Sequence, residues 1–169
     1  MNKSLGFALL ALLWSAPAIA QLTPVSYAVS FELAAPPTWD VYRDVGQMRL
    51  IALSPKEDEA DAFQENVNVV LEGMLPGMTW DAYMERNDFM MVQGLVEYEQ
   101  IGRTQVEVAG HPALRSVYLH TLNGQRLQVL SYTLQVDARV YVVTCTAPES
   151  TFAGHLDTFE AIAQSLSVG

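Results

Sequence analysis

Residues 62 to 72 read Ala-Phe-Gln-Glu-Asn-Val-Asn-Val-Val-Leu-Glu, and the conformation of this stretch decides the fold. On a helix, Phe63, Val67 and Val70 would share one face, whereas on a strand Val67, Val69 and Leu71 would all point inward. Three valines within four positions favour the strand, because β-branched side chains are stiff at χ1 and asparagine is a poor residue for a helix interior. We therefore predict a strand over Asn66 to Glu72, with a loop or a helical turn before it.

A helix is predicted after this strand, from Thr79 to Gln93. Thr79 is a suitable N-cap, and Asp81 places negative charge in the first turn, where the helix dipole favours it. We expect Gly94 to end the helix in the left-handed conformation. Apolar residues recur at helical spacing and predict a stripe that packs on a sheet, consisting of Trp80, Tyr83, Met84 and Met91.

The rest of the chain predicts a meander and a second helix. Asn123-Gly124 lies between two alternating runs and is a strong hairpin signal, since both central residues of a type I′ turn need a positive φ. The final helix opens near Pro148 and carries a regular apolar stripe. The strands expected are Val96 to Val108, with a bulge at Gly102, Leu114 to Leu122 after a turn over Gly110 to Pro112, Gln125 to Val136, and Arg139 to Thr146.

Further strands are predicted upstream of the central stretch. Ser26 to Leu33 alternates as a single strand, and Val41 to Asp44 with Met48 to Leu53 reads as a hairpin that ends at Pro55. Two helices with an antiparallel sheet predict the α+β class, here an α/β/α layered sandwich with a central, mainly antiparallel sheet and helices on both faces.

The first twenty residues are typical of a cleavable signal peptide. Lys3 gives a positive start, residues 5–14 form an apolar core too short to span a bilayer, and Ala18-Ile19-Ala20 is a small-residue cleavage site. We expect cleavage between Ala20 and Gln21, a periplasmic location, and a single domain over residues 21–169. No cysteine follows the cleavage site, so we expect no lipoprotein anchor and no stable attachment to the membrane.

Charge and cysteine content limit the classes of function. The chain has 19 acidic and 9 basic side chains, a net charge of −10, which disfavours nucleic acid and anionic lipid as partners and suits a basic one. Cys145 is the one cysteine, and in an exported protein it is either a reactive thiol or a buried apolar residue. The surrounding apolar run, residues 140–146, favours burial.

Several short motifs follow one another at characteristic spacing along the chain. They are Pro37 with Trp39, Leu53-Ser54-Pro55, Phe63 with Glu65 to Val70, Gly110-x-Pro112-Ala113, Tyr141-Val-Val-Thr, and Phe159-x-x-Ile162-x-x-Ser165. Together they resemble the PsbP/DcrB-like superfamily, in particular its exported bacterial DcrB-like branch. The resemblance implies helices on both faces of an antiparallel sheet. It also implies a binding function, since members include an extrinsic photosystem subunit, a Ran-binding release factor and chaperone-like proteins.

No motif for catalysis stands out. No G-x-S-x-G frames a serine, and no histidine pair has the spacing of a metal site. The metal hypothesis that remains combines Glu107, His111 and a neighbouring carboxylate, or uses methionine thioethers for Cu(I). We expect no cofactor and no enzymatic activity.

The favoured hypothesis is a non-catalytic binding or accessory protein of the cell envelope that recognises a protein or a hydrophobic ligand. Its contact surface would lie on the methionine-rich helix and its flanking loop, at Met78, Trp80, Phe89 and Met90. The methionines near this helix have a second interpretation as core, because methionine fills irregular gaps. The alternative function is a periplasmic protein that binds copper or zinc through methionine and histidine side chains. The sequence names neither the partner nor the oligomeric state.

Overall fold

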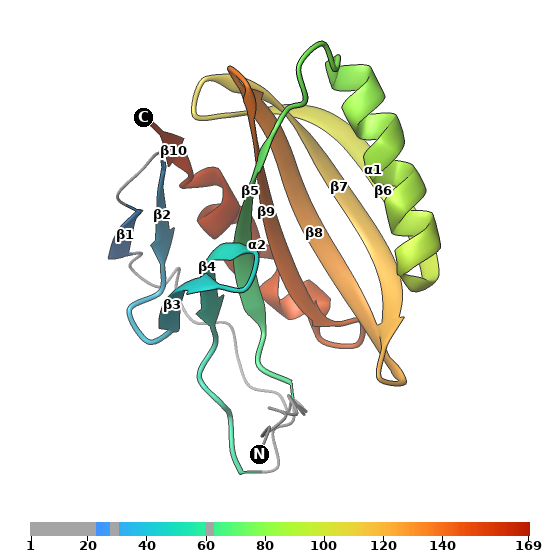
Figure 1. Cartoon of the computed structure of the whole chain (residues 1–169). Coiled ribbons are helices and arrows are strands. Elements are labelled where there is room, and N and C mark those ends of the chain that lie inside the picture. Colours follow the sequence, from blue (N-terminus) through green and yellow to red (C-terminus); the bar gives the residue numbers. More distant parts are fainter. Residues whose placement is uncertain (1–22, 28–30, 60–62) are drawn as a thin grey trace, which may run out of the picture.

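The computed structural model of the chain describes residues 23–27, 31–59 and 63–169. The predicted signal peptide lies outside this description, as do residues 28–30 and 60–62. Within the described residues, two helices and two antiparallel sheets form the layered α+β arrangement that the sequence predicts (Figure 1).

The larger sheet has seven strands in the order β3-β4-β5-β9-β8-β7-β6. Every neighbouring pair in it is antiparallel. The strands are β3 (Asp40–Val45), β4 (Met48–Leu53), β5 (Asn66–Gly73), β6 (Val96–Val108), β7 (His111–Leu122), β8 (Gln125–Val136) and β9 (Arg139–Pro148).

The central stretch forms strand β5, as predicted, and lies between β4 and β9. Val67 and Val69 are fully buried on one face of the sheet, and Asn66 and Asn68 alternate with them on the other face. Residues 63–65 are coil, and most of the segment before them, where a loop or a helical turn is expected, lies outside the described residues at 60–62.

The meander β6 to β9 turns through residues with positive φ. Asn123 (φ 52°) and Gly124 (φ 80°) form the predicted type I′ hairpin. Ala109 (φ 54°) and Gly110 (φ 75°) form the turn before it, so β7 begins at His111, and the expectation that His111 lies in the turn is wrong. The β6 register shifts between Gln100 and Gly102, where the bulge was predicted.

Helix α2 (Phe152–Gln164) packs on one face of the large sheet and forms the main core with it. Its predicted apolar stripe is confirmed, since Phe159 and Ile162 are fully buried, although β9 continues to Pro148 and the helix therefore starts later than predicted. Cys145 is buried in this core, as the sequence favoured, and burial raises the pKa of its thiol.

A small second sheet has the order β1-β2-β10, with β1 (Thr23–Tyr27), β2 (Phe31–Ala35) and β10 (Ser167–Val168). The prediction of one strand over Ser26 to Leu33 is wrong, because β1 and β2 are separate and antiparallel. Alternation with period two continues across both strands, so the sequence pattern did not reveal the reversal.

Helix α1 (Trp80–Gly94) connects β5 to β6, which lies at the far edge of the sheet. The chain then returns strand by strand through the meander until β9 pairs with β5. This crossover places α1 over the sheet face opposite α2, beside β6 and β7 (Figure 1).

Candidate binding site

Helix α1 starts and packs largely as its sequence predicts. The Ala82 backbone N–H donates to the Thr79 side chain at 3.2 Å, so Thr79 is the N-cap. Gly94 remains helical, and Leu95 follows it in an extended conformation (φ −101°), so the predicted left-handed cap is wrong. The reason is that β6 begins at Val96 and requires extended backbone directly after the helix.

A small set of contacts holds α1 on the sheet. Tyr83 and Met84 are buried against Val140 of β9. The Tyr83 hydroxyl donates to Glu72 of β5 at 3.0 Å, and burial, together with the Glu72 charge, raises the pKa of Tyr83. Toward the other end of the helix, Arg103 of β6 donates two hydrogen bonds to Asp88, at 2.5 and 2.7 Å.

The C-terminal half of α1 leaves large apolar side chains in solvent. Phe89 lies five residues after the buried Met84, which is about 140° around the helix axis and therefore on the outer side. We call four residues here the outer apolar patch: Phe89, Met90 and Val92 of α1 and Val96 at the start of β6, all between 57% and 64% exposed. Phe89 and Val92 are three residues apart and therefore neighbours on the helix surface, and exposed apolar patches are typical of interaction sites.

The four residues predicted to form the site fall at two different places. Phe89 and Met90 belong to the outer apolar patch, whereas Met78 and Trp80 are half-buried at the other end of α1. Trp80 stacks on Tyr83 with ring centroids 5.8 Å apart and faces the sheet. Nine residues of helix, about 14 Å, separate Trp80 from Phe89; Trp80 faces the sheet, whereas Phe89 is on the outer side of the helix.

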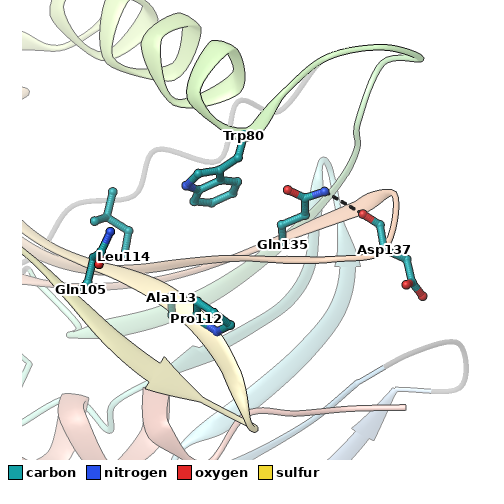
Figure 2. Close-up of a pocket in the computed structure, with 7 residues that line it drawn as sticks. All are labelled: Trp80, Gln105, Pro112, Ala113, Leu114, Gln135 and Asp137. Carbon is teal, nitrogen blue, oxygen red and sulfur yellow. Dashed lines mark hydrogen bonds between the residues drawn. The ribbon is translucent and has the colours of Figure 1, made fainter.

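Trp80 borders a cavity of about 380 Å³ between α1 and the sheet. Figure 2 shows its indole above Pro112 and Ala113, with Gln105 and Leu114 on one side and Gln135 on the other. The Gln135 amide donates to the backbone oxygen of Asp137 at 2.8 Å, which fixes its orientation. The sequence pattern predicted Trp80 as a binding residue but none of the sheet residues that face it.

A second cavity, of about 110 Å³, lies farther along α1. Met84, Asn87 and Met91 line it from the helix, and side chains of four strands line it from the sheet. We refer to the two cavities together as the inner cleft. The sheet residues of the second cavity are mostly polar and are Tyr98, Arg103, Ser116, Tyr118, Ser131, Thr133, Val142 and Thr144.

The histidines lie apart from one another. His120 is half-buried on β7, and burial lowers its pKa. The described part of the chain contains no group of three histidine, cysteine, aspartate or glutamate residues that could hold a metal ion. The proposed grouping around Glu107 and His111 is therefore not assembled there.

One buried carboxylate lies outside both surfaces. Glu65 accepts a hydrogen bond from Ser54 at 2.9 Å through one carboxylate oxygen, and its other oxygen lies 3.5 Å from the His155 ring. This contact links the residue before β5 to α2, and we assign it a structural role.

A family model for DcrB matches residues 52–165, about two thirds of the chain. The chain belongs to the DcrB family. No curated protein matches this DcrB family member significantly. No helix in the described residues is long and apolar enough to cross a bilayer.

Solved structures show that the fold extends beyond the DcrB family. The chain is similar to the cyanobacterial PsbP of Synechocystis sp. PCC 6803, with a TM-score of 0.67 and 16% identity over 93% of this chain and 98% of that one. It is also similar to LpqN of Mycobacterium tuberculosis, a protein involved in cell envelope biogenesis (0.64 and 16%, covering 88% and 90%). The Ran-binding protein Mog1p of Saccharomyces cerevisiae shares the fold as well (0.59 and 12%, covering 88% and 96%).

Proposed function

We propose that this DcrB family member is an exported accessory protein of the cell envelope that binds a partner protein and catalyses no reaction. Residues 21–169 would be the mature domain, in the periplasm. Membership of the DcrB family supports this, as do a fold neighbour involved in envelope biogenesis and another that binds Ran.

The observation that carries the proposal is the outer apolar patch. Four large apolar side chains at one end of α1 are more than half exposed, although the chain has buried positions for similar residues on the same helix. Burying such a patch against a partner removes apolar surface from water at about 25 cal/mol per Å². A partner could therefore gain binding free energy from these four residues without any change in the packing of the hydrophobic core.

The charges around the patch suggest the chemistry of the partner. Glu85 and Arg86 lie one helical turn before Phe89 and Met90, and Glu97 is next to Val96. All three are exposed, so two carboxylates stand beside one cation at the patch, and the whole chain carries a net charge of −10. A matching surface would present apolar side chains flanked by lysine or arginine. Binding should then weaken as salt rises, because the Debye length falls to about 3 Å at 1 M.

The test uses a photo-crosslinking amino acid at position 90 of the full chain, expressed in a bacterium that exports it. We expect one crosslinked partner, lost in Phe89→Ser and kept in Tyr42→Ser. Tyr42 is a matched control, because it is also a large exposed aromatic residue (49%) but lies on β3, at the opposite edge of the large sheet from β6. Equal loss in both variants, or crosslinks at position 42 as strong as at position 90, would contradict the proposal.

The assignment of both residues to a contact surface has its own check. Phe89→Ser and Met90→Ser should leave the melting temperature nearly unchanged, because both side chains are already mostly in water. Loss of folding in either variant would show that the residue supports the core. Mass spectrometry of the exported protein tests the location, with an N-terminus at Gln21 expected.

A further inference from the structure

Sheet residues form the floor of the inner cleft, and the pairing of the strands places them in two adjacent rows. Gln105 pairs with Leu114, and Leu114 pairs with Thr133. In the next row, Arg103 pairs with Ser116, and Ser116 pairs with Ser131. The first row contributes to the larger cavity and the second to the smaller one, so the two cavities are neighbours under the same helix.

The larger cavity combines a flat aromatic wall with uncharged hydrogen-bonding groups. The Trp80 indole stands above an apolar floor of Pro112 and Ala113, with Leu114 to one side (Figure 2). The carboxamides of Gln105 and Gln135 approach from opposite sides, and Gln135 turns its oxygen toward Trp80. A carboxamide offers both donors and acceptors, and an indole N–H is a donor.

Charge in the cleft is neutralised or turned outward. The two hydrogen bonds from Arg103 to Asp88 satisfy its guanidinium within the protein. Asp137 directs its carboxylate away from Trp80 (Figure 2). The remaining polar groups of the smaller cavity are mainly hydroxyls, including those of Ser116, Ser131 and Thr144. A neutral ligand with many hydroxyl groups matches this lining better than an ion does.

The backbone under the cleft is paired within the sheet. Strands β7 and β8 are paired on both sides, so their N–H and C=O groups are used within the sheet, and the open edge of β6 faces outward from the sheet. An extended peptide binds by adding main-chain hydrogen bonds at an open sheet edge, and the cleft lies on a sheet face. Recognition here must therefore come from side chains.

We propose that the inner cleft binds a neutral saccharide, with one sugar ring stacked on the face of Trp80 that Tyr83 leaves free and its hydroxyls bonded to Gln105 and Gln135. A pyranose ring has an apolar face of C–H groups, which suits the indole, and hydroxyls around its rim, which suit the two carboxamides. The cavity of about 380 Å³ is within the usual range for small-molecule sites. This site is separate from the outer apolar patch and does not depend on a protein partner.

The test applies the purified mature protein to a glycan array that carries neutral and acidic oligosaccharides. A neutral oligosaccharide bound on the array is then titrated while tryptophan fluorescence is followed, since Trp80 borders the site. Gln105→Ala should weaken binding about 2- to 10-fold, the effect of one neutral hydrogen bond. Trp80→Ala lacks the fluorescent reporter, so its binding is compared with that of the unmodified protein on the array, where it should be weaker by at least about tenfold. Gln105 is exposed, so its loss leaves the fold intact, and Gln47→Ala in the β3–β4 turn is the matched control.

Binding of neutral glycans that depends on Gln105 and Trp80 but not on Gln47 would support the proposal. The proposal is overturned if no neutral glycan binds on the array, if acidic glycans bind more tightly, or if Gln105→Ala has no more effect than Gln47→Ala. A fluorescence response to a neutral proline-rich peptide, without a response to any glycan, would overturn the proposal and assign the cleft to peptide instead.

Discussion

The two faces of the large sheet are packed unequally, and this predicts that α1 opens without the rest of the domain. On the α2 face, the main core includes Phe159 and Ile162. On the α1 face, the described core is limited to Tyr83, Met84 and Val140, and a cavity of about 110 Å³ lies beside them. Regions with few buried apolar contacts open locally at a lower free energy than global unfolding.

The perturbation that tests this is Ile162→Val. Ile162 is fully buried in α2, so the change should lower the free energy of global unfolding by about 1 kcal/mol. Opening of α1 leaves Ile162 packed, and its free energy should not change. Native-state hydrogen exchange should therefore show amides of β8 and β9 exchanging about fivefold faster, with amides of α1 unchanged.

Met84→Ala is the matched comparison. Its contacts are broken both when α1 opens and when the protein unfolds, so amides of α1 and of the core should accelerate together. The site borders a cavity, so we expect the lower end of the usual range, about 2 kcal/mol or roughly 30-fold. Equal acceleration of α1 and core amides in Ile162→Val would refute the reasoning, because it would mean that α1 opens only with the whole domain.

Three further predictions concern stability. Ser54→Ala removes the hydrogen bond to the carboxylate of Glu65, which is only 4% exposed, and should cost about 1.5–3 kcal/mol in urea denaturation; a loss below about 0.5 kcal/mol would contradict a buried charged acceptor. Burial raises the pKa of Tyr132, so the folded state holds this proton more tightly than the unfolded state does; stability should fall as pH rises above about 10, and melting curves of Tyr132→Phe should fall less steeply. Gly124→Ala places a side chain at φ 80° and should cost about 1–2 kcal/mol in thermal denaturation, whereas Gly154→Ala in α2 should stabilise by about 0.5–1 kcal/mol; the same sign for both would contradict the assigned backbone conformations.

The strands and helices could be predicted from the sequence where neighbouring residues themselves determine the backbone conformation. Asn123-Gly124 tolerates the positive φ values of its turn, and the valines of β5 bury themselves with a period of two. The end of α1 was not predictable in this way. Gly94 permits a left-handed cap, but the adjacent strand β6 imposes an extended backbone instead.

The two candidate surfaces differ in how far the sequence predicts them. Helical spacing already sets Phe89 apart from the buried stripe, because only local geometry is involved. The inner cleft needs Trp80, Gln105 and Gln135 to meet, and they come from α1, β6 and β8. Their meeting depends on the strand order and on the register of the meander, which no local pattern contains.

The position of α1 links the proposed saccharide site to the predicted local opening of this helix, and the link can be measured. Trp80 and Met84 belong to α1, whereas Gln105 and Thr133 belong to the sheet, so a ligand in the inner cleft would contact both elements. Opening α1 would then require release of the ligand. At a ligand concentration one hundred times the Kd, this linkage adds about 2.7 kcal/mol to the free energy of opening, which slows exchange of the α1 amides about 100-fold. A saccharide that binds without slowing these amides would have to contact the sheet alone, and the wall formed by Trp80 would then have no part in recognition.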